Sequence, residues 1–343
     1  MFLKTCHFCF FAVCEGEVII KHKKIHEQPF VSTMIKEKKT WKIATTTGDF
    51  ANYCKSDIDR IRELHLAGFR YIDLSMYSFT PDHVYMKDGW QDAVKTLKKV
   101  ADELGMTFVQ AHSQGGNALE DDRSHVDFLV KATVRSIEIC EMLGIKNTVV
   151  HAGFKAGISK EQWFEENKEF YEKLLPTARR CGVNVLCENS TAKNMGDRYY
   201  INSGKDMREF IEYVGDSNFH GCWDTGHANC EGPQYDEILA LGKELYAIHY
   251  NDNRAMQDEH IAPFFGTLNH DEVMHALIDI GFNGPFTLEC DSSLRTFNYW
   301  LGKRRPFEKD DRLSEPQLFM QRKVEELLYK TAEYILKKYD LAE

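Results

Sequence analysis

Side chains that could bind a metal ion recur along the chain at the ends of short apolar segments. Six consecutive segments stop at an imidazole or a carboxylate, namely His112, His151, Glu188, Asp224, His249 and Glu289. Core packing alone would not produce this pattern, because an apolar core does not need a polar residue at the same end of every segment. Carboxylates and imidazoles held close together repel or desolvate one another unless a cation gathers them. The segment ends therefore predict a divalent metal site.

The types of the expected ligands indicate which metal suits the site. Carboxylate oxygens and imidazole nitrogens without thiolates favour Mn²⁺, Mg²⁺, Co²⁺ or Zn²⁺ over a soft ion, and Mn²⁺ is the ion that we expect. Cys187 and Cys290 stand directly beside two of the expected ligands. Since adjacent residues of a strand face opposite sides, both thiols are expected to point away from the site.

The elements that must position these residues alternate between strand and helix. The predicted strands are 41–45, 71–74, 107–111, 148–150, 184–187, 219–223, 246–248 and 285–288. The predicted helices are 56–66, 90–104, 125–143, 159–180, 205–214, 235–241, 271–280 and 315–339. Short apolar strands separated by helices are typical of a parallel sheet covered by helices. Eight such units favour a closed (β/α)8 TIM barrel, an α/β fold in a single domain, over an open doubly wound sheet.

Composition argues against several other classes of protein. A formal net charge of -10 over 343 residues disfavours a polyanion such as nucleic acid as the main ligand. The ten cysteines lack a compact extracellular spacing, so we expect reduced thiols in the cytoplasm. No apolar run approaches the roughly 18 residues that span a bilayer. The dinucleotide-binding fingerprint, the nucleophile elbow and the P-loop are also missing from the sequence.

The first 40 residues differ in pattern from the rest of the chain. Met34 begins a Lys-rich lead-in to the first predicted strand. We therefore expect residues 1–40 to be an N-terminal extension, disordered or not translated, and residues 41–343 to form the barrel.

Four motifs carry a resemblance to a known family. Glu188-Asn, Asp224-Thr-Gly-His227, His249-Tyr-Asn-Asp252 and Gly284-Pro-Phe-Thr-Leu-Glu289 resemble the motifs of xylose-isomerase-like TIM barrels. That superfamily contains sugar and sugar-phosphate isomerases, ketose 3-epimerases, inosose-processing enzymes and DNA repair nucleases of the endonuclease IV type. The resemblance to the epimerases implies a metal quartet of Glu188, Asp224, His249 and Glu289, with both glutamates also acting as acid–base groups on opposite faces of the substrate.

The resemblance and the residue chemistry together predict an enzyme. A metal holding a carbonyl and its neighbouring hydroxyl would stabilise an enediolate, and a glutamate could then remove the adjacent proton. The expected function is a divalent-metal-dependent isomerase or epimerase of a keto-sugar, with Glu188, Glu289 and His151 as catalytic residues. His112, His227, His260 and Arg254 are expected to bind substrate. His227 could instead cap a helix, and Arg254 could be a solvated loop charge.

Two other enzyme classes stay open. C-glycoside deglycosidases have a large subunit that resembles these isomerases, paired with a small β-rich subunit, and cleave 3-keto-C-glycosides by β-elimination. The aromatic segments 76–79 and 297–300 could cover a flat aglycone, and the connection 292–313 is long. In the nuclease interpretation, His112, His151, His227, Asp258 and His260 join the quartet as ligands of three zinc ions. Acidic charge and the segment after His260, which lacks Pro-Gly-x-Gly, argue against it.

The expected partners follow from these alternatives. We expect a small-molecule sugar or glycoside as ligand, and either a homo-oligomer or a complex with a small β-rich subunit. No membrane is expected, and nucleic acid is the least expected partner. A binding module without catalysis is the remaining class, and a protein that holds no metal would favour it.

Overall fold

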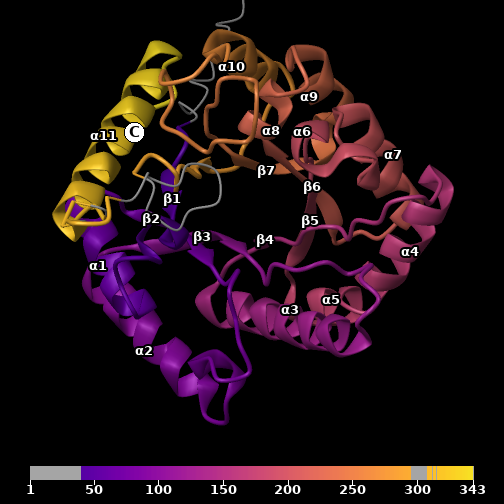
Figure 1. Cartoon of the computed structure of the whole chain (residues 1–343), viewed down its shortest axis with the longest axis horizontal. Helices are drawn as coiled ribbons and strands as arrows, with labels where there is room; N and C mark the ends of the chain where they lie inside the picture. Colours follow the sequence, from indigo (N-terminus) through magenta and orange to yellow (C-terminus); the bar gives the residue numbers. More distant parts are fainter. Residues whose placement is uncertain (1–39, 295–306, 311, 314, 343) are drawn as a thin grey trace, which may run out of the picture. The chain divides into compact units, whose positions relative to one another are not determined.

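Strands and helices alternate along the part of the chain that the computed structural model describes, residues 40–294, 307–310, 312–313 and 315–342 (Figure 1). The strands are β1 Ile43–Thr46, β2 Tyr71–Ser75, β3 Thr107–His112, β4 Asn147–Val149, β5 Asn184–Glu188, β6 Phe219–Asp224, β7 Leu245–His249 and β8 Phe286–Leu288. The longer helices are α1 Asp57–Ala67, α2 Trp90–Glu103, α3 Arg123–Leu143, α4 Lys160–Glu172, α7 Gly204–Val214, α10 His270–Asp279 and α11 Leu318–Lys338. The shorter helices are α5 Leu175–Cys181, α6 Ala192–Met195, α8 Thr225–Asn229 and α9 Tyr235–Leu241, with 3-10 turns η1 Thr47–Phe50, η2 Val84–Met86, η3 Gly196–Arg198 and η4 Gly242–Glu244.

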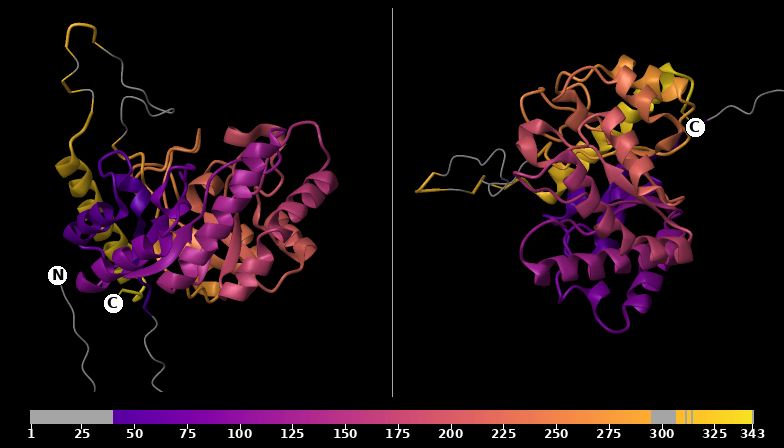
Figure 2. Two further views of the ribbon diagram at one scale, coloured as in Figure 1. Left: turned by 90° about the horizontal axis from the view of Figure 1, so that it is seen from below. Right: turned by 90° about the vertical axis from the view of Figure 1, so that its right-hand side faces the viewer.

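The strands form one parallel sheet that curls into a nearly closed barrel. Its order is β7-β6-β5-β4-β3-β2-β1-β8. Beyond the end of β7, Tyr250 forms a bridge to Leu288 and donates its N–H to the Thr287 carbonyl at 2.7 Å, which joins β7 to β8. Helices lie around the outside of the strands, as the views in Figures 1 and 2 show. The predicted single-domain (β/α)8 barrel is confirmed.

Strand alternation decides which side chains reach the barrel interior. Val149, Leu186, Cys222 and Ala247 form a small buried cluster of their own, whereas Cys187 belongs to the larger core. Leu186 and Glu188 lie two residues apart on β5, so they share a side of the sheet. The inward direction of Glu188 at the end of β5 follows from this register.

The first and last helices meet beside β1. The yellow helix α11 runs alongside the indigo helix α1 in Figures 1 and 2. Ser56 caps α1 by accepting from the Asp59 N–H, and Gly68 ends it with a φ of 109°. After α11 the chain returns to β1, where the Trp41 N–H donates to the Leu341 carbonyl at 2.8 Å. The two ends of the described barrel are therefore joined by a backbone hydrogen bond.

Some predicted boundaries differ from the structure. The helix predicted over 159–180 is two helices, α4 and α5, because Pro176 at the start of α5 has no N–H to continue the helix before it. Strands β5, β6 and β7 each run one residue further than predicted and include Glu188, Asp224 and His249. The predicted extension 1–40, apart from Thr40, and the aromatic segment 297–300 lie outside the described residues, as does most of the connection 292–313.

Among the helices of the described residues, none has the length and apolarity that crossing a membrane requires.

Candidate active site

Three carboxylates and one imidazole converge at the carboxyl end of the barrel. Glu188, Asp224 and His249 are the last residues of β5, β6 and β7, and Glu289 follows β8 directly. One ligand atom from each of the four side chains lies within 4.8 Å of the other three. His249 Nδ1 lies 2.6 Å from Glu188 Oε1 and 3.2 Å from Glu289 Oε2. A cluster of this kind, buried and rich in anionic oxygens, suits a divalent cation.

Asp224 is held in place by the turn that follows its strand. Its Oδ1 accepts the His227 N–H at 2.6 Å, so Asp224 is the N-cap of α8, and its Oδ2 accepts from Asn251 Nδ2 at 2.6 Å. Asn189 bonds both backbone groups of Asp224. Gly226 permits this arrangement, since a Cβ there would lie 1.9 Å from Asn251 Oδ1. Asp224 is therefore held by residues that follow three neighbouring strands, Asn189 after β5, His227 after β6 and Asn251 after β7.

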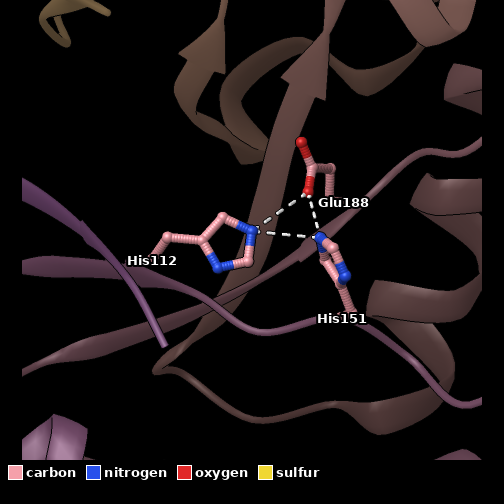
Figure 3. A group of neighbouring side chains, drawn as sticks. All are labelled: His112, His151 and Glu188. Atoms are coloured by element: carbon pink, nitrogen blue, oxygen red, sulfur yellow. Dashed lines mark hydrogen bonds and ion pairs between the residues drawn. The ribbon is translucent and has the colours of Figure 1, made fainter. Parts of the chain in front are cut away.

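Glu188 also contacts a pair of histidines (Figure 3). His151 Nε2 lies 2.8 Å from Glu188 Oε2 and 3.0 Å from His112 Nε2, and His112 Nε2 lies 3.8 Å from the same carboxylate oxygen. His112 Nδ1 donates to the Ser113 carbonyl at 3.0 Å, so its Nε2 carries a hydrogen only when the ring is charged; burial would lower the pKa of His112, but the hydrogen bond and charge of Glu188 raise it. Three polar atoms thus meet at one point, where a proton, a cation or a substrate hydroxyl can join them.

A second pair of histidines flanks Asp258 on the other side. His227 Nε2 lies 3.1 Å from Asp258 Oδ2, and His260 Nε2 lies 2.9 Å from Asp258 Oδ1. His260 Nδ1 in turn lies 3.5 Å from Glu289 Oε2. His260 adopts a φ of 46°, the left-handed conformation that non-glycine residues seldom occupy. Such strain is concentrated at functional sites, where the surrounding contacts maintain it.

The surroundings give the two glutamates different proton affinities. Burial by itself would raise the pKa of Glu188, but the charge of His249 and hydrogen bonds from His112, His151 and His249 hold it well below its ordinary value. Burial raises the pKa of Glu289, and the nearby Glu188 charge acts in the same direction. Burial would lower the pKa of His227, but Asp224 and Asp258 raise it to about 10. The pKa of Glu188 is thus shifted down and that of Glu289 up from the ordinary value of a glutamate.

Glu188, Glu289 and His227 line a cavity of about 650 Å³. Tyr77, Phe154 and Met195 supply an apolar part of its lining. The Tyr77 ring meets His112 and His151 edge-on, with ring centroids 5.2 Å and 5.7 Å apart. Among the described lining residues there is no lysine or arginine. The cavity thus combines acid–base side chains with an aromatic wall.

The structure brings together most of the residues predicted from the sequence. His112, His151, Glu188, His227, His260 and Glu289 line the cavity, and Asp224 and His249 lie fully buried beside them. Arg254 is not a lining residue, because its largely exposed guanidinium pairs with Glu259.

Three polar residues near the site had no predicted role. Cys222 Sγ lies within 4.8 Å of ligand atoms of Glu188 and His249, but burial raises the pKa of its thiol to about 12, which keeps it neutral. Asp73 lies in the barrel interior behind His249. Asn251 stands two residues after His249. An acid inside the apolar segment 71–74 was the available signal for Asp73.

Comparison with known proteins gives the same fold. The model of the family described as xylose isomerase-like TIM barrel matches residues 61–311. The chain spans about half the length of the curated relatives it matches, such as the uncharacterized protein MJ1311 of Methanocaldococcus jannaschii, 27% identical over 151 residues, 41% of this chain and 49% of that protein.

Solved structures of similar fold cover nearly all of this barrel. A D-psicose 3-epimerase with D-fructose present has a TM-score of 0.64 and 16% identity over 86% of this chain and 99% of that chain. The 3-keto-D-glucoside 4-epimerase YcjR of E. coli has a TM-score of 0.62 and 17% identity over 85% of this chain and 100% of that chain. The IOLI protein with a bound zinc atom has a TM-score of 0.64 and 17% identity over 87% of this chain and 99% of that chain.

Proposed function

The chain belongs to the xylose isomerase-like TIM barrel family, and we propose that it is a divalent-metal-dependent carbohydrate enzyme of the isomerase or epimerase type. It removes a proton from the carbon next to the carbonyl of a keto-sugar. The observation that carries the proposal is the convergence of Glu188, Asp224, His249 and Glu289 beside a cavity large enough for a sugar.

These four residues fit a divalent metal. Their donor set is three carboxylates and one imidazole nitrogen, and burial makes their mutual repulsion costly without a cation. Such donors suit Mn²⁺, the ion we propose, as well as Mg²⁺, Co²⁺ or Zn²⁺. When bound, the metal would polarise the substrate carbonyl and stabilise the negative charge that develops beside it.

The side chains of this protein account for the proton transfers. Glu188 and Glu289 act as the acid–base pair, so that one carboxylate takes the proton from carbon and the other carboxyl returns one. Glu289 is the more accessible of the two, with a side chain 18% exposed against 2% for Glu188. His151 acts with them on a substrate oxygen, and His112, His227 and His260 hold substrate hydroxyls.

Replacing Glu289 by Gln tests the proposal most directly. We expect turnover to fall by about 10²- to 10⁴-fold, because the amide cannot transfer a proton. Metal binding should weaken as well, because one anionic ligand is lost. The assay is deuterium uptake from D₂O into keto-sugars and keto-glycosides, with calorimetric titration of Mn²⁺.

The matched control for this variant is Glu244→Gln. Glu244 also pairs with a histidine, His220 at 2.7 Å, but this pair lies at the amino ends of β6 and β7, away from the proposed metal site. It should keep wild-type rates and metal affinity. Wild-type turnover in Glu289→Gln would refute the assignment.

A second candidate function is β-elimination on a 3-keto-C-glycoside, and the aromatic wall formed by Tyr77 and Phe154 favours it. The first step is the same proton removal, here from the carbon between the carbonyl and the aglycone-bearing carbon. The bond to the aglycone then breaks, and the aglycone carbon keeps the electron pair and takes up a proton. Release of a phenolic aglycone from a 3-keto-C-glycoside, with no deuterium uptake into free ketoses, would select this function.

Partners and compartment complete the proposal. We propose a homo-oligomer or a complex with a small β-rich subunit, which fits the exposed side chains of Phe264 and Phe265 before α10. The cysteines of the described residues are all free and buried, which fits a reducing compartment such as the cytoplasm. Light scattering of the purified protein, alone and with co-purifying chains, measures the assembly.

A further inference from the structure

Two apolar side chains stand at the wall of the cavity in the loops beyond the strand ends. Phe154 lies in the loop that follows β4, three residues after His151. Met195 is the last residue of α6, in the connection that follows β5. Both side chains line the cavity and are only partly buried. An apolar side chain kept at an open cavity wall suits an apolar ligand group.

Two asparagine side chains hold the backbone at Phe154. Asn117 Oδ1 accepts from the Phe154 N–H at 2.8 Å, and Asn117 Nδ2 donates to the Phe154 carbonyl at 2.9 Å. Asn167 does the same for Gly153, accepting from its N–H at 2.6 Å and donating to its carbonyl at 3.3 Å. A Cβ at Gly153 would lie 2.6 Å from Leu119 Cγ, so the residue there must be small. These contacts fix the direction in which the Phe154 side chain leaves the backbone.

Arg198 holds both apolar residues without lining the cavity itself. Its Cζ lies 5.1 Å from the centroid of the Phe154 ring, within the range of a cation–π contact. Its Nε donates to the Met195 carbonyl at 2.9 Å, and its Nη2 donates to the Asn194 carbonyl at 3.1 Å. The Arg198 carbonyl accepts from the Lys155 N–H at 3.1 Å. One arginine therefore joins the loop after β4 to the connection after β5.

The cavity offers these fixed side chains room for a second part of the substrate. Its volume of about 650 Å³ falls within the range of about 300–1,000 Å³ that is typical of sites for drug-sized ligands. A sugar ring at Glu188 and Glu289 would leave part of this space free. The described lining has no lysine or arginine to bind a phosphate. A flat aromatic ring beside an adaptable methionine suits another aromatic group, and side chains already held in place lose little freedom when it binds.

We propose that Phe154 and Met195 form a subsite for an apolar aromatic aglycone, with Arg198 as its positioning residue. The substrate is then a glycoside of a keto-sugar, and not a free ketose or a sugar phosphate. The inference rests on the proposed function in that the sugar ring lies at Glu188 and Glu289. It holds whether the aglycone is kept, as in epimerisation, or released, as in β-elimination. Binding of the aglycone needs neither metal nor turnover.

Unreactive glucosides test the subsite directly. Phenyl and methyl glucosides have no keto group, so calorimetric titration measures their binding without turnover, for both anomers. We expect wild type to bind the phenyl glucoside about tenfold more tightly than the methyl glucoside, because the phenyl ring buries apolar area. Phe154→Ala should remove most of this preference and change the affinity for the methyl glucoside by less than about twofold.

Replacing Arg198 tests its role as a positioning residue. Arg198→Met should lower the preference for the phenyl glucoside about threefold, because the Phe154 ring and the Met195 loop are held less firmly. Arg198→Lys should fall between this variant and wild type, since it keeps the charge but not the planar set of donors. A loss of general stability alone would weaken the binding of both glucosides equally.

Two matched controls lie away from the cavity. Phe319 is an exposed phenylalanine of α11, and Arg208 of α7 pairs with Glu212. Phe319→Ala and Arg208→Met should both match wild type for the two glucosides. If Phe154→Ala does not fold, Phe154→Leu decides by the same titrations, because it keeps an apolar side chain but removes the ring.

Three results would overturn the proposal. These are equal or no binding of the two glucosides by wild type, a phenyl preference that survives in every Phe154 variant that folds, and tighter binding of glucose 6-phosphate than of the phenyl glucoside. If wild type prefers the phenyl glucoside but introduces deuterium into no keto-sugar, the proposed function fails and the subsite stands. If deuterium enters free ketoses and the phenyl preference is absent, the subsite fails and the proposed function stands.

Discussion

Tyr77 and Gly115 form a pair in which one residue makes room for the other. The Tyr77 ring lies against His112 and His151, and the Gly115 N–H donates to the Tyr77 carbonyl at 3.0 Å. A Cβ at Gly115 would lie 2.2 Å from Cζ of the Tyr77 ring. The position of the aromatic wall therefore depends on the absence of a side chain at Gly115.

Gly115→Ala should displace the Tyr77 ring from the histidines. We expect KM for the substrate to rise about tenfold while Mn²⁺ affinity stays unchanged, because Tyr77 is not one of the four proposed ligands. Stability should fall by only about 1 kcal/mol, the low end for overpacking, because the partly exposed ring can swing outward.

A double-mutant cycle checks that the displaced Tyr77 ring causes the changes in KM and stability. In a Tyr77→Ala background the added methyl group has space, so Gly115→Ala should then change neither KM nor stability. Equal effects of Gly115→Ala in both backgrounds would contradict this interpretation.

At the residue scale, the sequence predicted the ends of the strands better than their interiors. Glu188, Asp224, His249 and Glu289 could be found because each stops an apolar segment, and parallel strands end on one face. Asp73 and Cys222 lie inside strands, where a sequence pattern does not show whether a polar side chain points toward the site from the barrel interior. Arg254 could not be placed, because its pairing with Glu259 depends on how one loop folds.

A buried acid of helix α11 and a second buried acid meet at Thr45 of β1. Glu325 of α11 and Asp49 of η1 are both buried, and Thr45 Oγ1 lies 3.4 Å from Glu325 Oε2 and 3.2 Å from Asp49 Oδ2. Burial raises the pKa of Glu325 to about 7 and raises the pKa of Asp49 well above its ordinary value. The folded protein therefore holds a proton between them that the unfolded chain releases near pH 4.5.

This contact should make stability depend on pH. Because the folded pKa of Glu325 is raised, its contribution is complete below the unfolded value of 4.5 and is lost as pH rises through about 7. Relative to Glu325→Gln, wild type should therefore lose up to about 3 kcal/mol between pH 5 and pH 8. Urea unfolding of both proteins at the two pH values measures the difference.

The control for this experiment is Glu326→Gln on the same helix, where Glu326 pairs with Lys323 at the surface. The free energy of unfolding of Glu326→Gln should equal that of wild type at both pH values. If Glu325→Gln loses as much free energy of unfolding between pH 5 and pH 8 as wild type does, the proposed shared proton is contradicted.

Elements were predictable where the pattern is long and regular. The 21 residues of α3 carry a clear period, and the strands stand out as short apolar segments between turns. The break between α4 and α5 was missed although Pro176 marks it, because the apolar pattern continues across it. Helix α8 has only 5 residues, and its start depends on the Asp224 cap, which serves the site at the same time.

For the whole molecule, metal binding and folding should be linked. An ion held by Glu188, Asp224, His249 and Glu289 binds only the folded chain, and at 100 times its Kd it would add about 2.7 kcal/mol of stability. We expect a chelator to lower Tm by several degrees and Mn²⁺ to restore it, as measured by circular dichroism. An Asp224→Asn/Glu289→Gln double variant should show no such shift, and an unchanged wild-type Tm would count against the metal site.

The number of bound ions separates two interpretations of the site. One metal per chain fits the proposed sugar enzyme. Three metals per chain would instead favour a nuclease, because His112, His151, His227, Asp258 and His260 would then all be ligands. Elemental analysis of the purified protein gives this number directly.

The hydrogen bond between Trp41 and Leu341 holds the two ends of the described barrel together. The chain could therefore be joined at this place and opened in another loop. A short linker from residue 342 to residue 40 would close the ring. New ends could be opened at Gly105, an exposed glycine between α2 and β3 with no atom close to its Cβ position. In such a circular permutant β3 would be the first strand to be synthesised, and every strand would keep its neighbours in the sheet.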